Sequence, residues 1–274
     1  MQPDEIKRLT ELSLAEKIEH AKSIITEALD RFSPDALYVA WTGGKDSTTM
    51  LWLYREACNA LGKPLPKTMF IDEGSVFEEI WELVEQVKDL WNVEVAVVKN
   101  ADVSAKAKEM GDLIRVADLN PRNRAEVAKL EFKDEFFPFE PESFVGNHLM
   151  KTVAMNVFLE DNGVEALSTA IRWDEQEARV KEQVFSPRTN PAHTRIHPIL
   201  HFRERDIWDT IHAHKIPYCS LYSQGYRSLG AKGSTYKNLD IPAWEQDLEN
   251  TTERAGRGQA KEQVMAKLRD LGYM

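Results

Sequence analysis

The sequence predicts an α/β fold, with a doubly wound and mostly parallel five-stranded sheet and a helical C-terminal extension. Short apolar runs alternate along the chain with segments in which apolar residues recur at helical spacing, and this alternation is typical of βαβ units. Of the 274 residues, 42% are hydrophobic, which is enough for a large core.

The predicted elements begin with a helix over residues 14–32. Ser13 and Glu16 form a capping box at its start. The apolar residues 37–41 then predict a buried strand, and a second helix follows to about residue 61. Further strands are expected at 67–71, 93–98, 166–170 and 196–200, and further helices after a capping box of Ser75 with Glu78, at 147–160, at 205–212 and at 259–271.

Residues 99–147 do not follow this alternation. Residues 120–124 have a loop-like composition, and the segment from Phe132 to Phe144 contains two prolines. We expect either a lid or substrate-binding insertion, or a flap that binds a partner, and the sequence leaves both open.

A glycine loop, Thr42-Gly-Gly-Lys-Asp-Ser47, separates the first strand from the second helix. Gly43 and Gly44 allow a sharp turn, so that backbone amides at the helix N-terminus can face an anion. Lys45 adds a positive charge and Ser47 a hydroxyl group. The loop therefore predicts a phosphate site, although its spacing is not that of the Walker P-loop.

This strand, loop and helix resemble the PP-loop (SGGKDS) of the ATP-pyrophosphatase superfamily, with Thr42 in place of the first serine. That superfamily includes PAPS reductase, the ATP sulfurylase small subunit, FMN adenylyltransferase and tRNA-thiolating enzymes. The resemblance implies an adenine nucleotide alpha hydrolase-like fold with ATP and Mg²⁺ as cofactors. It also implies three segments: a helical segment at 1–36, the nucleotide-binding domain at 37–230, and a tail with a helix at 231–274.

Ligands of parallel sheets bind at the carboxyl ends of the strands, where both the glycine loop and Asp72 fall. The stretch Asp72-Glu-Gly74 resembles the Asp-Thr-Gly of the reductases, and a simple turn role for Asp72 is the alternative. The expected nucleotide-binding residues are Ala40, Thr42, Gly43, Gly44, Asp46, Ser47, Asp72, Ser228 and Gly230.

Other stretches resemble two different members of the superfamily. Ile171-Arg-Trp-Asp-Glu175 with Arg179 resembles the GxRRDE…R segment of the ATP sulfurylase small subunit, and residues 252–273 resemble its SERQGR…GY tail. In contrast, Phe185–Pro187 and Gly225–Gly230 are among several stretches that resemble FAD synthase.

The chemistry expected is attack at the α-phosphate with pyrophosphate as the leaving group. Lys45, Arg172 and Arg227 are the predicted catalytic residues, and the two arginines are expected to converge on one anion through planar contacts. Asp174 and Glu175 are candidates either to bind Mg²⁺ or to orient Arg172. In the tail, Arg254 and Arg257 either fold over the site or form surface ion pairs.

Reduction of a sulfonucleotide is not expected. PAPS reductases resemble one another in a C-terminal cysteine nucleophile, but residues 271–274 contain no cysteine and Ala231 follows Gly230 where some relatives carry one. Cys219 lies in an apolar run and is expected to be a packed side chain.

His193, His197 and His201 are spaced by four, but Pro198 interrupts any helix that would place them on one face. We therefore do not expect them to bind a metal. The net charge of −10 makes nucleic acid an unlikely partner. No apolar run reaches the length of a membrane span and the N-terminus lacks a secretion signal, so a cytoplasmic protein is expected.

The leading hypothesis is an adenylyltransferase of the ATP sulfurylase small-subunit type, which makes adenosine 5′-phosphosulfate from ATP and sulfate. FMN adenylylation is one alternative, and a reductase-fold nucleotide-binding subunit without activity of its own is another. The expected partners are a small anionic acceptor and either a separate GTPase large subunit or further copies of this chain.

Overall fold

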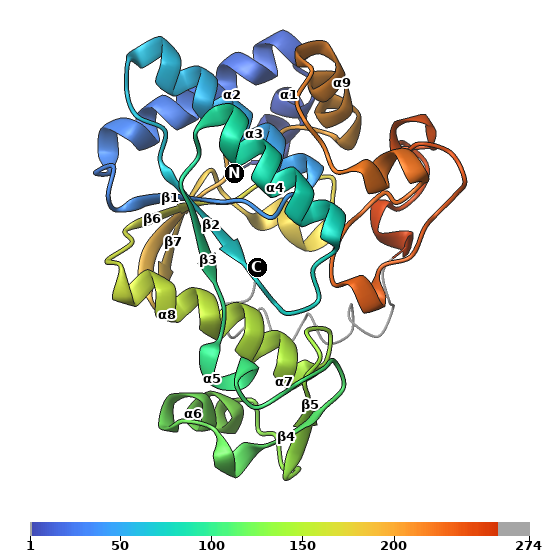
Figure 1. Ribbon diagram of the computed structural model, residues 1–274. Helices are drawn as coiled ribbons and strands as arrows, with labels where there is room; N and C mark the ends of the chain where they lie inside the picture. The colour runs from blue at the N-terminus through green and yellow to red at the C-terminus, as the bar shows by residue number, and fades with distance from the viewer. Residues whose placement is uncertain (1, 257–274) are drawn as a thin grey trace.

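The computed structural model describes residues 2–256 and contains one six-stranded sheet with the order β3-β2-β1-β6-β8-β7. All neighbouring pairs are parallel except β7 with β8. The mostly parallel, doubly wound sheet is confirmed (Figure 1), with one strand more than predicted. The strands are β1 (Leu37–Ala40), β2 (Lys67–Ile71), β3 (Val95–Val98), β6 (Ala166–Ser168), β7 (Phe185–Thr189) and β8 (Ala192–Ile196).

The prediction was wrong at the last part of this sheet. The strand expected at 196–200 ends at Ile196 instead, and the antiparallel strand β7 was missed. Asn190 and Pro191 form the turn between β7 and β8, a dipeptide that favours turns. Pro187 in β7 is compatible with a strand at the edge of the sheet, where an amide donor is dispensable.

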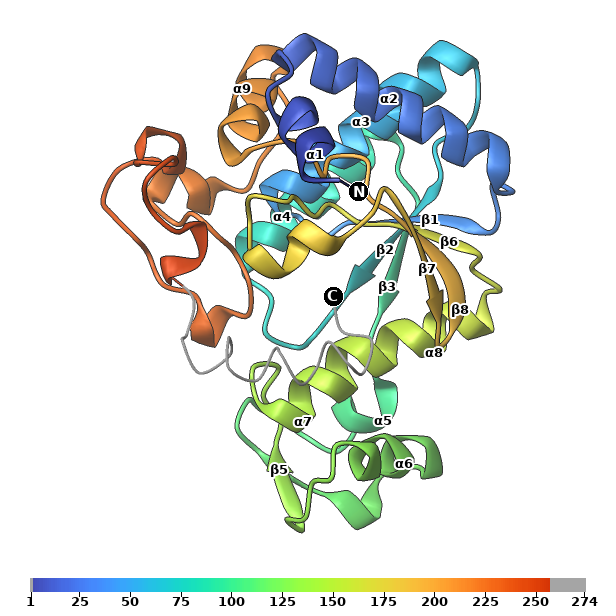
Figure 2. The ribbon, with the colours of Figure 1, turned by 180° about the vertical axis from the view of Figure 1, so that it is seen from behind.

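Helices cover both faces of the sheet (Figures 1 and 2). The capping box of Ser13 with Glu16 is confirmed at the start of the second helix. The box predicted for Ser75 is wrong, because the next helix starts only at Glu78 after an uncapped Phe77, while the Ser75 carbonyl accepts the Lys232 amide. The flanking helices are α1 (Pro3–Thr10), α2 (Leu14–Arg31), α3 (Lys45–Leu61), α4 (Glu78–Trp91), α8 (Ala154–Asp161) and α9 (Glu204–His214).

The alternation of side chains along β1 separates two apolar cores. Leu37 and Val39 belong to the larger core, beneath α2, α3, α4 and α9. Tyr38 and Ala40 face the other side and pack with Met155 and other residues of α8. This period of two is the pattern expected of a strand buried on both faces.

The insertion at 99–147 folds into a small substructure with its own apolar cluster, seen at the bottom of Figures 1 and 2. It consists of α5 (Ala101–Ser104), β4 (Leu113–Arg115), α6 (Pro121–Lys129), β5 (Phe136–Pro138) and α7 (Phe144–Asn147). A π-helical turn, His148–Val153, joins it to α8. Such turns occur often at functional sites.

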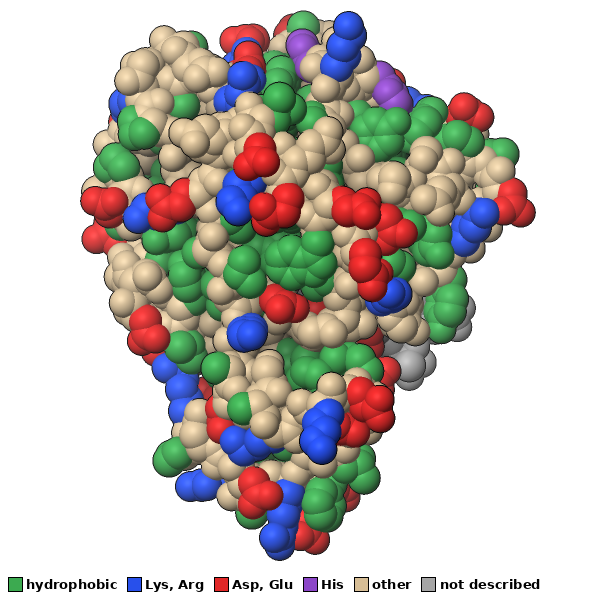
Figure 3. Space-filling model, viewed as in Figure 1, with side chains coloured by type: hydrophobic (Ala, Val, Ile, Leu, Met, Phe, Trp, Pro, Cys, Tyr) green, Lys and Arg blue, Asp and Glu red, His purple; other side chains and the backbone are tan. Residues whose placement is uncertain are grey.

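Short 3₁₀ turns carry the chain from α9 to the end of the described residues, and among these are Ser220–Gln224 and Glu253–Gly256. The predicted helix at 259–271 and Arg257 lie outside residues 2–256. Within the described part of the chain, no helix combines the length and apolar character needed to cross a membrane. Acidic and basic side chains are interspersed on the face in Figure 3.

Candidate active site

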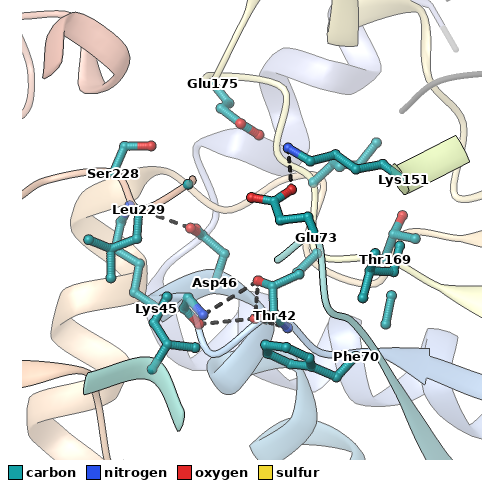
Figure 4. A pocket seen from close by; sticks show the side chains of 18 of the residues that line it. Thr42, Lys45, Asp46, Phe70, Glu73, Lys151, Thr169, Glu175, Ser228 and Leu229 are labelled. Carbon is teal, nitrogen blue, oxygen red and sulfur yellow. Dashed lines mark hydrogen bonds and ion pairs between the residues drawn. The ribbon is translucent and has the colours of Figure 1, made fainter. Parts of the chain in front are cut away.

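A cavity of about 310 Å³ lies at the carboxyl ends of β1, β2 and β6. The glycine loop, the π-helical turn, the loop at 222–230 and the tail at 253–254 complete its wall (Figure 4). Seven of the predicted residues line it: Ala40, Thr42, Gly44, Asp46, Ser47, Ser228 and Gly230, together with the predicted catalytic Lys45.

The two glycines of the loop have different roles. Gly43 has a φ of +70°, and a Cβ atom there would lie 2.7 Å from Cγ2 of Ile80, so the turn itself requires glycine. Gly44 is the extended N-cap of α3; a Cβ there would meet Thr42 Oγ1 at 3.3 Å. Gly44 supplies no side-chain cap, although the Lys45 amide donates to the Tyr222 hydroxyl at 2.9 Å; an N-terminus without its own capping side chain is suited to binding phosphate.

Lys45 lies inside the wall, with 1% of its side chain exposed. Its Nζ is 2.5 Å from Oε1 of Glu253 and 3.7 Å from Oε1 of Glu204, and it donates to the carbonyl of Arg227 at 3.1 Å. Burial alone would lower the pKa of Lys45, but the carboxylates of Glu253 and Glu204 outweigh it and raise the pKa. Lys45 is therefore a buried, fixed positive charge.

Arg172 forms the second cation of this cluster. Its Nη2 donates to Oε2 of Glu253 at 2.5 Å, its Nη1 to Asp46, and its Nε to Asp174 at 2.8 Å. The carboxylate of Glu253 thus bridges Lys45 and Arg172. Burial would raise the pKa of Glu253, but the two cations prevail and hold the pKa below its ordinary value.

Glu253 is a residue of the site that the sequence analysis missed. It comes from the tail, and its carboxylate lies between the cations of Lys45 and Arg172. In the sequence, the signal for Glu253 was the resemblance of residues 252–257 to a family tail. The functional prediction for that stretch named Arg254 and Arg257 instead. Arg254, beside it, pairs with Glu175 at 3.0 Å rather than lying on the open surface.

Arg227 is also buried, but it does not converge with Arg172 on one anion. Its guanidinium donates to Glu204 at 2.7 Å and to the backbone carbonyls of Asp247, Leu248 and Thr251. Neither Arg227 nor Arg172 lines the cavity itself, and Arg172 reaches it only through Asp46 and Glu253, which do. The predicted convergence is wrong in this structure because a buried guanidinium needs acceptors on all sides, and α9 and residues 247–251 supply them. Arg227 therefore links residues 247–251 of the tail to Glu204 of α9.

Asp174 and Glu175 are both paired with arginines. Asp174 accepts from Arg172 and from the Glu204 amide at 2.8 Å, so it orients Arg172. Glu175 lines the cavity and is paired with Arg179 at 3.4 Å and with Arg254. Within residues 2–256 no group of three or more His, Cys, Asp or Glu side chains is placed to hold a metal ion.

At the end of β2 the structure brings Glu73, not Asp72, to the cavity. Asp72 accepts the Gly74 amide at 2.9 Å, the simple turn role that was the alternative. Glu73 lines the cavity and pairs with Lys151 of the π-helical turn at 2.5 Å, as Figure 4 shows. Asp72 does not line the cavity, because its carboxylate is turned to the amide of its own turn.

The two cysteines are buried, and the three histidines spaced by four are hydrogen-bonded to different groups. Cys219 is 1% exposed, burial raises the pKa of its thiol to about 11, and neither it nor Cys58 lines the cavity. His193, His197 and His201 bind different groups: the Pro191 carbonyl, the Thr169 hydroxyl and the Lys17 carbonyl.

Comparison with known proteins gives one family and two kinds of relative. A family model described as "Phosphoadenosine phosphosulfate reductase domain" matches residues 36–237. The adenosine 5′-phosphosulfate reductase of Geobacillus sp. (strain WCH70) is 22% identical, over 80% of this chain and 81% of the relative. The sulfate adenylyltransferase subunit 2 of Pseudomonas syringae pv. tomato is 25% identical, over 94% of this chain and 83% of the relative. The chain spans 66% of the Geobacillus thermodenitrificans reductase, at 23% identity.

Two crystal structures share the fold. Candida glabrata FMN adenylyltransferase, in complex with FMN and an ATP analog, has a TM-score of 0.59 at 18% identity and covers 97% of this chain and 88% of its own. The phosphoadenylyl-sulfate reductase of Candida auris has a TM-score of 0.57 at 19% identity and covers 86% of this chain and 98% of its own. At these identities the likeness concerns the fold alone.

Proposed function

The chain belongs to the phosphoadenosine phosphosulfate reductase domain family, and we propose that it is an adenylyltransferase that transfers AMP from ATP to a small anionic acceptor, with sulfate as the leading candidate. The observation that carries this proposal is the buried cation pair of Lys45 and Arg172, which holds the Glu253 carboxylate beside the N-terminus of α3. Such a pair suits phosphate oxygens.

In the proposed reaction, an oxygen of the acceptor attacks the α-phosphorus of ATP. The bond from that phosphorus to the bridging oxygen breaks, and pyrophosphate leaves with the electron pair. The glycine loop binds the departing phosphates, while Lys45 and Arg172 neutralise the charge that collects there. Catalysis then comes from positioning and from electrostatic stabilisation rather than from covalent chemistry by the protein. The Glu253 carboxylate must leave the cation pair before a phosphate takes its place.

Reductase chemistry fits this chain less well. Attack on sulfur requires an accessible thiolate. Burial keeps the pKa of both cysteine thiols near 11, well above the range in which a thiolate is common, and neither cysteine lines the cavity.

The cavity has a volume of about 310 Å³ with the tail in place, which is at the lower end of the range for ligand pockets. Mg²⁺ would enter with the triphosphate and share its charge; no residue of this chain is assigned to it.

Because several relatives are named as subunit 2 of sulfate adenylyltransferase, we propose a separate large subunit, a GTPase, as the partner.

The test is pyrophosphate release from ATP by the purified chain, alone and with a GTPase large subunit. Sulfate, FMN or no acceptor is added, and inorganic pyrophosphatase converts the product to phosphate for measurement. Sulfate-dependent release that Lys45→Met abolishes supports the proposal. Release that depends on FMN assigns the flavin reaction instead, and sulfite formation from adenosine 5′-phosphosulfate with a thiol donor would overturn adenylyl transfer.

A further inference from the structure

Three polar side chains, Thr169, His197 and Glu182, lie in a row that begins at the cavity wall. Thr169 follows β6 and lines the cavity, although only 2% of it is exposed. In Figure 4 it lies near Lys151 and Phe70, across from Ser228 and Leu229. No step of the proposed reaction uses it.

His197 lies directly behind Thr169, because each residue follows a strand and β6 pairs with β8. Its Nδ1 is 2.7 Å from the Thr169 hydroxyl oxygen. Its Nε2 faces Oε2 of Glu182 at 3.6 Å, a distance that is too long for a hydrogen bond but places a carboxylate opposite that nitrogen.

The charges around His197 decide where its proton lies. Burial lowers the pKa of the ring, Glu182 raises it, and the guanidiniums of Arg195 and Arg188 lower it again; the pKa falls on balance, which favours the neutral imidazole. The nearby His197 ring and the charge of Arg188 outweigh burial and hold the pKa of Glu182 at about 2, so Glu182 is ionised. A lone pair on Nε2 would face this negative charge, and a proton there is favoured instead.

With the proton on Nε2, Nδ1 of His197 is an acceptor and the single hydroxyl proton of Thr169 must point to it. Only the lone pairs of Thr169 then remain for a ligand. A second threonine of the lining, Thr152, has a buried hydroxyl without a hydrogen-bond partner among the described residues, which also leaves polar capacity for a bound molecule.

We propose that Thr169 is a specificity-determining residue that accepts a hydrogen bond from a donor of the bound nucleotide, and that His197 and Glu182 are positioning residues that fix it as an acceptor. This inference rests on the proposed function, since it places a nucleotide in the cavity. With the triphosphate on the glycine loop, the donor comes from the nucleoside part, either the adenine amino group or a ribose hydroxyl.

The experiment compares ATP binding by calorimetry with binding of three analogues: 2′-deoxy-ATP, 3′-deoxy-ATP and purine riboside triphosphate, which lacks the amino group. In the wild type, one analogue should bind about three- to tenfold more weakly than ATP, as for one lost neutral hydrogen bond. Thr169→Val should weaken ATP by the same factor and leave that analogue unchanged, whereas Thr169→Ser should restore the preference. The analogue that is affected identifies the donor.

The control is Thr210→Val, at a buried threonine whose hydroxyl binds its own helix carbonyl in α9. A second readout is the ¹⁵N spectrum of the His197 ring without ligand, which should show the proton on Nε2 in the wild type and a shift toward Nδ1 in Glu182→Gln. A proton on Nδ1 in the wild type, or an equal loss of all four nucleotides in Thr169→Val, would overturn the inference. Failure of the wild type to bind ATP would instead remove the proposed function.

Discussion

The glycine loop and the tail at 247–254 both contact the cation pair of Lys45 and Arg172, but different interactions hold the two segments in place. The loop is continuous with β1 and α3, and its shape follows from backbone geometry and from packing against Ile80. The tail is held by side chains: Arg227 binds its carbonyls, and Glu253 binds Lys45 and Arg172. A ligand can replace the second kind of contact without disturbing the first, so the tail is the part of the site that a nucleotide is expected to move.

The largest effect is expected from Lys45→Met, which removes a charge that the loop and the tail share. Turnover with the true acceptor should fall by about 10²- to 10³-fold, as for a lost donor to a developing negative charge. The measurement is kcat from pyrophosphate release, with Lys63→Met as the control because Lys63 forms an exposed pair with Asp30. Wild-type turnover in Lys45→Met would exclude Lys45 from the chemistry.

A second prediction separates the two glycines of the loop. Gly44→Val is compatible with the backbone, but it fills space beside Thr42 and Tyr222, so ATP affinity should fall at least about tenfold while the thermal midpoint stays near that of the wild type. Gly43→Ala should instead lower the thermal midpoint, because Gly43 has a positive φ and a close neighbour in Ile80. Calorimetry and thermal melts test the pair. Unchanged ATP affinity in Gly44→Val would refute the phosphate-binding role of the loop.

The third prediction concerns a variant in which ATP affinity rises rather than falls. Glu253→Gln removes the carboxylate that occupies the cation pair, so ATP affinity should rise, on the order of tenfold if the closed tail hides most sites. Stability without ligand should fall by about 3–5 kcal/mol, because two buried cations lose their shared partner. ATP should then raise the thermal midpoint more in this variant than in the wild type.

The matched control for this variant is Glu249→Gln, which changes an exposed carboxylate of the same tail. It should leave ATP affinity unchanged. If Glu253→Gln weakens ATP binding, the carboxylate supports the nucleotide site rather than competing with the nucleotide.

The same difference explains how much of the molecule could be predicted from the sequence. The strand, loop and helix at 37–61 follow from local features of the sequence: an apolar run, two adjacent glycines and apolar residues at helical spacing. They were predicted at nearly the right residues. The partners of Arg172 and Arg227 depend on which distant carboxylates reach them. Glu253 lies 81 positions from its partner Arg172, and Glu204 lies 23 positions from its partner Arg227, so no local pattern marks them. Strand β7 was missed for a related reason, since its only neighbour is β8 and its sequence contains a proline.

The smallest effect is expected at the outer edge of the tail, where Arg205 of α9 pairs with Glu249 at 3.0 Å. Both side chains are largely exposed, at 40% and 58%, so solvent screens the pair and its contribution should not exceed about 1 kcal/mol. Arg205 also donates to the Trp244 carbonyl, a contact that Arg205→Lys loses while the charge is kept. We therefore expect Arg205→Ala to lower the free energy of unfolding slightly, and 1 M salt to remove the part of this loss that comes from the ion pair but not the part that comes from the Trp244 contact. Denaturant titration at low and high salt measures this. A loss as large as that of Glu253→Gln would show that the outer pair, and not the buried carboxylate, holds the tail in place.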